Sequence, residues 1–368
     1  MADRPRPQVV FSIGGLERGG SETQLVNVVE RLHGTRLDAT VVTLGRAADP
    51  ELVARLRRVG VPVLPMRSRS GPRPWRMGMS AARIGAVLER RRSDAVYAWL
   101  EEAAMLTAPM AALTRTPFLV ARRNVNGPYA ERGALVVRLI HAAERRARVV
   151  TVNSQAVGEA TLARGVPAER VRLVANGHAL EPALAEPRDG EVALGYVARF
   201  RAEKGHLRLL DALSQVRTDA PWRIDLAGDG PLLAEVAGES RRRGLDGHVR
   251  FVGAMSDPRA FWADRHVAVL LSDHEGSPNA LIEAALAGRP MIATAVGGVP
   301  EVVSPDGGRL VPADDPAAIA AAIVALIEDG DLRRRAGQAA RRQAVERFSI
   351  ERSVDGHWAA IDEALAGR

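Results

Sequence analysis

The sequence contains no cysteine, a single lysine and few aromatic residues. Without cysteine the chain can form neither a disulfide nor a thiolate site, which suits a reducing compartment. Aromatic residues make up 4% of the 368 residues, and none is interleaved with a basic stretch, so base-stacking surfaces are not expected. No apolar stretch is long enough to span a membrane, and the N-terminus lacks the features of a signal peptide. We therefore predict a cytoplasmic protein.

Acidic and basic residues are unevenly distributed along the chain. Residues 1–180 contain 28 arginines against 15 acidic residues, a net charge of +13, whereas residues 181–368 contain 23 basic against 29 acidic residues, a net charge of −6. This asymmetry favours a first half that contacts something anionic, such as an acidic lipid surface, a phosphorylated substrate or nucleic acid. The alternative is that these arginines lie on exposed surfaces and contact only water.

Short apolar runs alternate with longer amphipathic segments, which predicts parallel sheets covered by helices. We expect strands at residues 8–13, 39–44, 61–65, 94–99, 117–121, 148–153, 191–198, 222–228, 248–253, 266–272 and 289–295. The predicted fold is α/β, with two doubly wound domains at residues 1–182 and 189–348. A segment rich in proline and alanine joins them, and a final helix at about 349–368 is expected to pack back on the first domain.

Ligands of doubly wound domains bind at the carboxyl ends of the strands, and the strongest motif of this chain follows a predicted strand. In HEGSPNALIEAALAGRP, Glu275 and Glu283 lie on either side of a predicted helix start. Glu283 is the only charged residue on an otherwise apolar helix, and a carboxylate there is costly unless it accepts hydrogen bonds. Ribose hydroxyls would supply them.

The same motif predicts an anion site at a helix N-terminus. Ser277 suits the N-cap, and Pro278 suits the first helical position, where its missing N–H costs nothing. The backbone amides of Asn279, Ala280 and Leu281 would then be available to an anion.

The single lysine, Lys204, follows Arg199 by five residues across a predicted strand-to-helix turn. Lysine is a compact point charge on a flexible stem, whereas arginine presents a planar fork. Two cations that flank a helix start favour a diphosphate. The alternative is that Arg199 and Lys204 are ordinary surface residues that bind no ligand.

Glycine-containing turns follow three further predicted strands. Gly228 and Gly230 permit a tight turn and the close approach of a ligand, although a plain tight turn explains them equally well. The strand end from Arg250 to Gly253 lies at the same edge, where backbone groups could contact a base. In the first half, Gly19 and Gly20 lack the spacing of a dinucleotide fingerprint. We expect their backbone to approach a ligand, with Ser21 as the cap of the following helix.

Together these segments resemble family 4 of the retaining, nucleotide-sugar-dependent glycosyltransferases, which have the GT-B architecture of two Rossmann-like domains. The resemblance covers nearly the whole chain, and its specific parts are the Glu-x7-Glu stretch and the Arg199–Lys204 pair. It implies that Arg199 and Lys204 hold the donor diphosphate, that Glu283 binds the ribose and that Glu275 faces the donor sugar. It implies further donor contacts at Gly19, Gly20, Gly228, Gly230, Arg250, Phe251, Gly276, Ser277, Asn279 and Ala280.

The family uses no metal and no cofactor, since cations and a helix terminus neutralise the leaving diphosphate. One position departs from the family pattern: Trp99 stands where many relatives have a histidine near the donor sugar. Glu101 or Glu102 could take a polar role there, or both could face solvent at a helix start. The segment 122–127, with Arg122, Arg123 and Asn124, follows the fifth strand and could contact a charged acceptor.

The sequence thus predicts a retaining, metal-independent hexosyltransferase that uses a nucleotide diphosphate sugar, which we expect to be a UDP-sugar. Its products would be envelope or exopolysaccharide glycans or small glycosides. The acceptor would be anionic or lipid-linked, with peripheral contact to the inner membrane face through the basic first half. A nucleotide-sugar epimerase of the same fold and a non-enzymatic nucleic-acid-binding protein are the alternatives, but no nucleic-acid partner is expected.

Overall fold

The computed structural model consists of two α/β units. Unit 1 comprises the chain up to Gly177 together with the segment that begins at Ile350, and unit 2 comprises His178–Ser349. Residues 178–182, which were predicted to end the first domain, therefore belong to unit 2. The structure describes residues 5–17, 19–45, 48–66, 73–125, 133–182, 187, 190–255 and 257–367. Six residues of the predicted linker segment, 183–186 and 188–189, lie outside these ranges.

Unit 1 is built on a seven-stranded parallel sheet with the strand order β3-β2-β1-β4-β5-β6-β7. Its elements are β1 (Gln8–Ile13), α1 (Gly20–Leu32), β2 (Asp38–Thr43), α2 (Pro50–Arg58), β3 (Val63–Pro65), α3 (Arg73–Arg90), β4 (Ala95–Trp99), α4 (Glu101–Leu113), β5 (Phe118–Arg122), α5 (Ala134–Arg146), β6 (Val149–Val152), α6 (Gln155–Leu162), β7 (Val171–Leu173) and α14 (Ile350–Ala366). A 3-10 turn, Ala168–Arg170, precedes β7.

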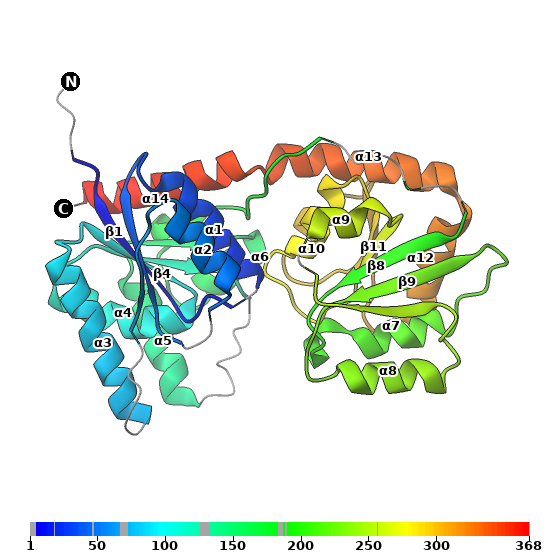
Figure 1. Cartoon of the computed structure of the whole chain (residues 1–368), viewed down its shortest axis with the longest axis horizontal. Coiled ribbons are helices and arrows are strands. Elements are labelled where there is room, and N and C mark those ends of the chain that lie inside the picture. Colours follow the sequence, from blue (N-terminus) through cyan, green and yellow to red (C-terminus); the bar gives the residue numbers. More distant parts are fainter. Residues whose placement is uncertain are drawn as a thin grey trace. The chain divides into compact units, whose positions relative to one another are not determined.

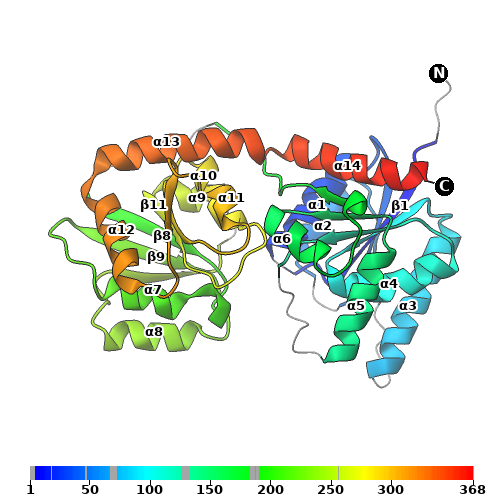
Figure 2. The same ribbon diagram turned by 180° about the vertical axis from the view of Figure 1, so that it is seen from behind.

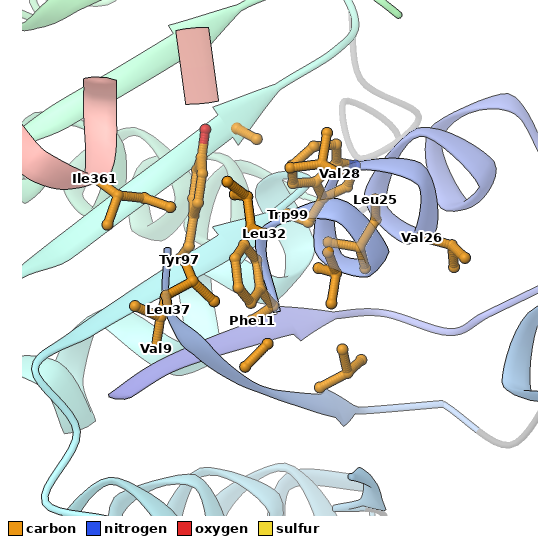
Figure 3. Packing of buried hydrophobic residues seen from close by; sticks show 14 of the residues in the cluster. Val9, Phe11, Leu25, Val26, Val28, Leu32, Leu37, Tyr97, Trp99 and Ile361 are labelled. Atoms are coloured by element: carbon orange, nitrogen blue, oxygen red, sulfur yellow. The ribbon is translucent and has the colours of Figure 1, made fainter. Parts of the chain in front are cut away.

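Helices cover both faces of this sheet, as the two views in Figures 1 and 2 show. The apolar strands are buried on both faces, as expected for parallel strands, and every residue of β4 and β5 is buried. One core cluster packs α1, α2 and α14 against the sheet, and the other packs α3, α4 and α5 against its opposite face. Figure 3 shows part of the first cluster, including Phe11, Tyr97, Trp99, Leu32 and Ile361.

Unit 2 is built on a six-stranded parallel sheet with the order β10-β9-β8-β11-β12-β13. Its elements are β8 (Val192–Val197), a 3-10 turn (Ala202–Lys204), α7 (His206–Leu213), β9 (Trp222–Ala227), α8 (Leu233–Arg242), β10 (Val249–Gly253), α9 (Pro258–Ala263), β11 (Val267–Leu270), α10 (Asn279–Leu286), β12 (Met291–Thr294), α11 (Val299–Val302), β13 (Gly308–Val311), α12 (Pro316–Glu328) and α13 (Gly330–Arg347).

Both sheets have the strand order of a doubly wound fold, so the predicted fold class is confirmed. In such sheets successive strands are added first towards one edge and then, from a neighbouring central strand, towards the other. Ligands bind beyond the carboxyl ends of the two central strands at which this order reverses. These strands are β1 and β4 in unit 1 and β8 and β11 in unit 2. A ligand site is therefore expected in the loops that follow these four strands. Within the described ranges, no helix is both long and apolar enough to cross a bilayer.

Candidate functional site

Two of the predicted donor residues meet at the carboxyl edge of the unit 2 sheet. Lys204 follows β8 and Glu275 follows β11, and these strands are neighbours. The Nζ atom of Lys204 lies 2.6 Å from Oε1 of Glu275, and the Ser272 hydroxyl donates to the same oxygen at 2.7 Å. Lys204 and Glu275 keep 24% and 12% of their side-chain surface exposed. The site therefore holds a charge pair that an incoming ligand can reach.

Buried hydroxyl groups hold the backbone around this pair. The Tyr196 hydroxyl donates to the carbonyl of Lys204 and accepts from the amide of Leu271 at 3.0 Å. Burial raises the pKa of this hydroxyl, so it stays protonated. The Thr294 hydroxyl donates to the carbonyl of Ser272 at 2.6 Å. Sequence reasoning missed Tyr196 and Thr294, and the signal for Tyr196 was a polar ring in the apolar strand VALGYV.

The loop after β12 supports Glu275 from another direction. Gly297 has a φ of +50°, and a Cβ at this position would collide with the carbonyl oxygen of Glu275. The amide of Gly298 donates to the same carbonyl at 3.1 Å. This Gly-Gly pair was also missed, although it directly follows a predicted strand.

Arg199 is exposed beyond the end of β8, on a segment that the glycine loop after β9 holds. The amide of Phe200 donates to the backbone carbonyl of Asp229 at 2.9 Å. Gly228 and Gly230 have φ values of +146° and +156°, and a Cβ on either would collide with the backbone of Ala198 or Phe200. These glycines therefore allow the close approach of the chain's own Arg199 segment.

Other predicted residues of unit 2 lie around these loops. Phe251, on β10, is partly buried, with its ring centroid 6.0 Å from that of Phe200, and Arg250 beside it is exposed. The amide of Gly228 donates to the carbonyl of Gly253 at 2.8 Å, which ties the end of β10 to the glycine loop. Gly276 is buried next to Glu275.

The start of α10 differs from the prediction. Pro278 is the N-cap and not the first helical residue, because its ψ of 103° is extended and the helix begins at Asn279. Ser277 is therefore not the cap. The amide of Leu281 donates to the carbonyl of Pro278 at 3.1 Å, so this amide is not available to an anion as predicted.

Glu283 lies on α10 beside a histidine that sequence reasoning missed. Burial raises the pKa of Glu283 to about 8. The Nδ1 atom of His178 lies 4.0 Å from its carboxylate, while Nε2–H donates to Oδ1 of Asn279 at 3.2 Å. Burial lowers the pKa of His178 to about 4, so the ring is neutral at pH 7 and the approach to Glu283 is not an ion pair. The amide of His178 donates to Phe348 at 2.9 Å, which fixes its backbone.

In unit 1 the glycine loop leads directly into α1. The helix begins at Gly20 with Gly19 as its N-cap, because the amide of Thr23 donates to Gly19 at 3.0 Å. Ser21 lies inside the helix and is not the cap that we predicted. Its carbonyl instead accepts the indole N–H of Trp99 at 3.0 Å. The donor contacts predicted for Gly19 and Gly20 stay predictions.

Trp99 is completely buried in a polar cluster at the end of β4. The Arg123 guanidinium lies 4.3 Å above its ring, donates to Asn176 at 3.0 Å and approaches Nε2 of His357 at 2.8 Å. Burial lowers the pKa of Arg123 to about 10, and only 3% of the residue is exposed. Trp99 and Arg123 thus have structural partners within unit 1, and neither offers surface to an acceptor.

Arg122 belongs to a second buried cluster. It has no exposed surface, and its guanidinium donates to the Thr161 hydroxyl at 2.8 Å and to the Val125 carbonyl at 2.7 Å. Oε1 of Glu101 lies 3.5 Å from Nε of Arg122. Burial, with a further contribution from the Glu144 carboxylate, raises the pKa of Glu101 to about 7. Arg122 therefore cannot meet an acceptor as predicted, and Glu101 does not face solvent.

Glu102 and Asn124 are partly buried and remain possible polar contacts at this edge. The rest of the predicted acceptor segment, residues 126–127, lies outside the described residues. In the part of the chain that the structure describes, no three His, Asp or Glu side chains come together as metal ligands.

Comparison with known proteins identifies the family. Residues 19–177 match the sequence family described as "Glycosyl transferase 4-like domain", and residues 191–329 match the family described as "Glycosyl transferases group 1". The chain belongs to glycosyltransferase family 4. Both matches together cover the glycine loop of unit 1 and every predicted donor residue of unit 2.

Curated relatives match parts of this family 4 member. The N-acetyl-alpha-D-glucosaminyl L-malate synthase of Bacillus anthracis is 29% identical over 167 residues, 45% of this chain and 44% of the relative. The phosphatidyl-myo-inositol mannosyltransferase of Mycolicibacterium smegmatis is 35% identical over 163 residues, 42% of this chain and 40% of the relative. The chain thus spans less than half the length of these two relatives.

A solved structure resembles the whole chain. HepE of Anabaena, crystallised in complex with UDP and glucose, has a TM-score of 0.85 and 22% sequence identity, with 99% of this chain and 100% of HepE covered. At this level of identity the similarity concerns the fold, which is the GT-B architecture.

Proposed function

We propose that this protein transfers a hexosyl unit from a nucleotide diphosphate sugar to an acceptor hydroxyl, with retention at the anomeric carbon. The observation that supports the proposal most is the Lys204–Glu275 pair beyond β8 and β11, where doubly wound domains bind ligands. In a family 4 member, this pair provides a cation for a diphosphate and a carboxylate for a sugar. HepE, with the same fold, is named in complex with UDP, which supports a UDP-sugar as the donor.

The proposed roles follow from the chemistry of each side chain. Arg199 and Lys204 bind the diphosphate, and Arg199 is an exposed residue beyond the end of β8. Glu275 accepts hydrogen bonds from hydroxyls of the donor sugar. Glu283 accepts them from the ribose, which compensates for the burial that raises its pKa. Gly276, Ser277 and Ala280 contribute backbone groups near the start of α10.

The reaction breaks the bond between the anomeric carbon and the diphosphate oxygen, and the electron pair stays on the phosphate. The acceptor oxygen attacks the same face of the sugar, and its proton passes to the departing phosphate oxygen. Lys204 and Arg199 stabilise the negative charge that grows on this phosphate in the transition state. The sugar carbon has oxocarbenium character at that point.

His178 adds a residue to the proposed donor site. Its ring contacts Asn279 and faces Glu283, one helical turn further along α10. A neutral ring whose backbone is fixed by Phe348 limits the rotamers of both side chains. We assign His178 the role of positioning these two side chains for the donor.

An anionic or lipid-linked acceptor suits the basic first half of the chain. The names of the two curated relatives contain L-malate and phosphatidyl-myo-inositol, and both compounds are anionic. Unit 1 would then face the acceptor or the inner membrane surface that presents it. Merely solvated arginines remain the alternative to such a contact.

The test combines a donor screen with one matched pair of variants. Hydrolysis of a panel of UDP- and GDP-sugars in the absence of acceptor identifies the donor, and calorimetry measures its affinity. Glu283→Ala should weaken binding of the matching nucleoside diphosphate by at least tenfold, since it removes a charge-assisted hydrogen-bond acceptor worth about 1.5–3 kcal/mol. Glu235→Ala, which removes an exposed carboxylate from α8 of the same unit, should leave that affinity unchanged.

Unchanged affinity in Glu283→Ala would rule out the ribose assignment. If no nucleotide sugar is bound or hydrolysed, the transferase proposal itself is wrong. Inversion at the anomeric carbon in the isolated product, measured by its proton coupling constant, would contradict retention.

A further inference from the structure

A cluster of arginines lies at the edge of the unit 1 sheet where the strands begin, opposite the edge formed by their carboxyl ends. A cavity of about 270 Å³ opens where β5 and β6 begin, between the last turns of α4 and α5. Three of its nine lining residues are arginines, namely Arg115, Arg146 and Arg148, and none of the nine is acidic. All three arginines are exposed. Three exposed cations around one cavity, with no acidic residue in its lining, attract an anion.

Helix capping accounts for Arg148, whose guanidinium donates to the Ala364 carbonyl in the last turn of α14 at 2.9 Å, but not for Arg115 and Arg146. Basic residues are common at helix C-termini because they can bind the last carbonyl groups. Here Thr114 donates to the carbonyl of Met110 through both its amide and its hydroxyl, at 2.9 Å each. At the end of α5, Arg170 donates to the carbonyls of Arg145 and Ala147 at 3.2 and 3.4 Å. Residues other than the cavity arginines thus already cap both helix ends.

The backbone at Arg115 adopts a conformation that is uncommon for a residue with a side chain. Its φ of +55° lies in the left-handed region, which favours glycine and is unfavourable for residues with a Cβ. Glycine takes this conformation after α6 and α8, where Gly165 and Gly244 have φ values of +81° and +68°, but Arg92 also takes it after α3, with a φ of +48°, without lining the cavity. At the end of α4 the chain has an arginine, whose side chain lines the cavity.

We propose that this cavity binds a phosphate-type anion. Guanidinium groups match phosphate oxygens in pairs, and three of them neutralise a dianion. The volume admits a phosphate group together with the first atoms of its ester. The phosphate could belong to a soluble phosphate ester or to an anionic lipid headgroup. Leu113, two residues before Arg115 and 73% exposed, would suit the lipid interface.

The proposed site is separate from the carboxyl edge. Phe118 lines the cavity at the start of β5, and Arg122 ends the same strand, which separates the two edges by roughly 13 Å. The cavity residues belong to unit 1, so substitutions there should leave the proposed donor residues of unit 2 intact, and binding of the anion does not depend on the transferase proposal.

The test compares two double variants of equal charge. Arg115→Gln with Arg146→Gln removes two cavity arginines and leaves Arg148, whose guanidinium also donates to the carbonyl of Ala364 at 2.9 Å. Arg57→Gln with Arg58→Gln removes two exposed arginines from α2 of the same unit. Binding is measured with inorganic phosphate by calorimetry and with phosphatidylcholine vesicles, with or without phosphatidylglycerol, by cosedimentation at low salt.

The wild type and the α2 variant should bind at least one probe, and the cavity variant should lose about tenfold or more in affinity. Binding of phosphate alone indicates a soluble ester, and binding only to vesicles with phosphatidylglycerol indicates a headgroup. Equal losses in both double variants, or no binding by the wild type, would overturn the proposal. Should the cavity variant fail to fold, Ala112→Glu places a carboxylate in the cavity without removing an arginine, and retained binding in this variant would equally overturn it.

Discussion

The pairing of Lys204 with Glu275 offers a physical reason for a lysine at this one position. A single ammonium group reaches Oε1 of Glu275 at 2.6 Å, from a turn whose carbonyl the Tyr196 hydroxyl holds. A diphosphate would recruit the same ammonium group, so Glu275 and the phosphate compete for it or share it. The three donors of an ammonium permit sharing, whereas the wider fork of arginine fits only one planar partner well.

Lys204→Ala should therefore lose roughly 2–5 kcal/mol of transition-state stabilisation, mostly in kcat, because charge grows on the leaving phosphate. Lys204→Arg should also be impaired, since the charge remains but the fork cannot take the same place. Arg201→Ala, which removes an exposed cation three residues earlier, is the control. Steady-state kinetics decide the point: wild-type values from Lys204→Arg would mean that the single lysine of this chain has no special role.

Glu283 should make the stability of the free protein depend on pH. Its pKa is raised to about 8 by burial, above the usual value of 4.5, so the folded form binds the proton more tightly than the unfolded chain. The stabilising contribution is therefore present below pH 4.5 and is lost as the pH rises towards 8 and beyond. Glu283→Gln should flatten the decline of Tm between pH 5 and 9, as followed by thermal unfolding. Parallel Tm profiles for both proteins would contradict this.

His178 can be tested by rescue. Removing its hydrogen bond to Asn279 should cost about 1 kcal/mol, so His178→Ala should weaken UDP binding by about fivefold. His178→Gln keeps an N–H donor on a side chain of similar reach and should restore much of the affinity. His248→Ala loses the stack on Trp222, with centroids 4.1 Å apart, and should lower stability but not UDP affinity. If His178→Gln loses as much UDP affinity as His178→Ala, then His178 contributes packing alone.

At the scale of the elements, the Tyr196 hydroxyl joins the turn after β8 to the end of β11. It is the only side-chain group that binds both the Lys204 carbonyl and the Leu271 amide among the described contacts. Tyr196→Phe leaves both backbone groups without this partner in a buried place, which should cost about 1–3 kcal/mol in the free energy of unfolding. Because the turn positions Lys204, kcat should fall as well. Denaturant unfolding and kinetics on the same preparation test this, and a stability loss without any change in kcat would separate the turn from catalysis.

Most elements were predictable, and those that were not share a physical cause. The strands β7 and β13 were missed because they are edge strands of three and four residues with partly exposed side chains, so neither has an apolar run. The cap of α1 was predicted two residues too late and that of α10 one residue too early, because backbone dihedrals at Gly19 and Pro278, and not side-chain hydrogen bonds, begin these helices. Alternation of apolar runs is a strong signal, whereas the residue that starts a helix depends on tertiary contacts.

At the scale of the whole molecule, the sequence singled out Lys204 and Glu275, which the structure pairs, but not the groups that hold them. Lys204 and Glu275 stood out as motifs, yet the contacts of Tyr196, Thr294 and Gly297 join segments that are distant in the chain. Likewise, the hydroxyl of Tyr97 lies within hydrogen-bond distance of Nδ1 of His357, at 2.8 Å, although the two residues are 260 positions apart in the sequence. The contact forms because α14 belongs to unit 1. Periodicity reveals which face of an element is buried, but it does not reveal which residue lies opposite.

The charge distribution of unit 2 leads to the last prediction, which concerns metal dependence. The leaving diphosphate needs positive charge, and in the proposed mechanism Arg199 and Lys204 provide it from the chain itself. We therefore expect kcat/KM to stay the same, within about twofold, after treatment with EDTA and on addition of magnesium or manganese. The control is Lys204→Ala, which removes one of these two proposed cations: a divalent ion should then partly replace the missing charge and raise the residual rate. Loss of wild-type turnover in EDTA, with recovery on adding manganese, would mean that these side chains do not suffice to neutralise the leaving group.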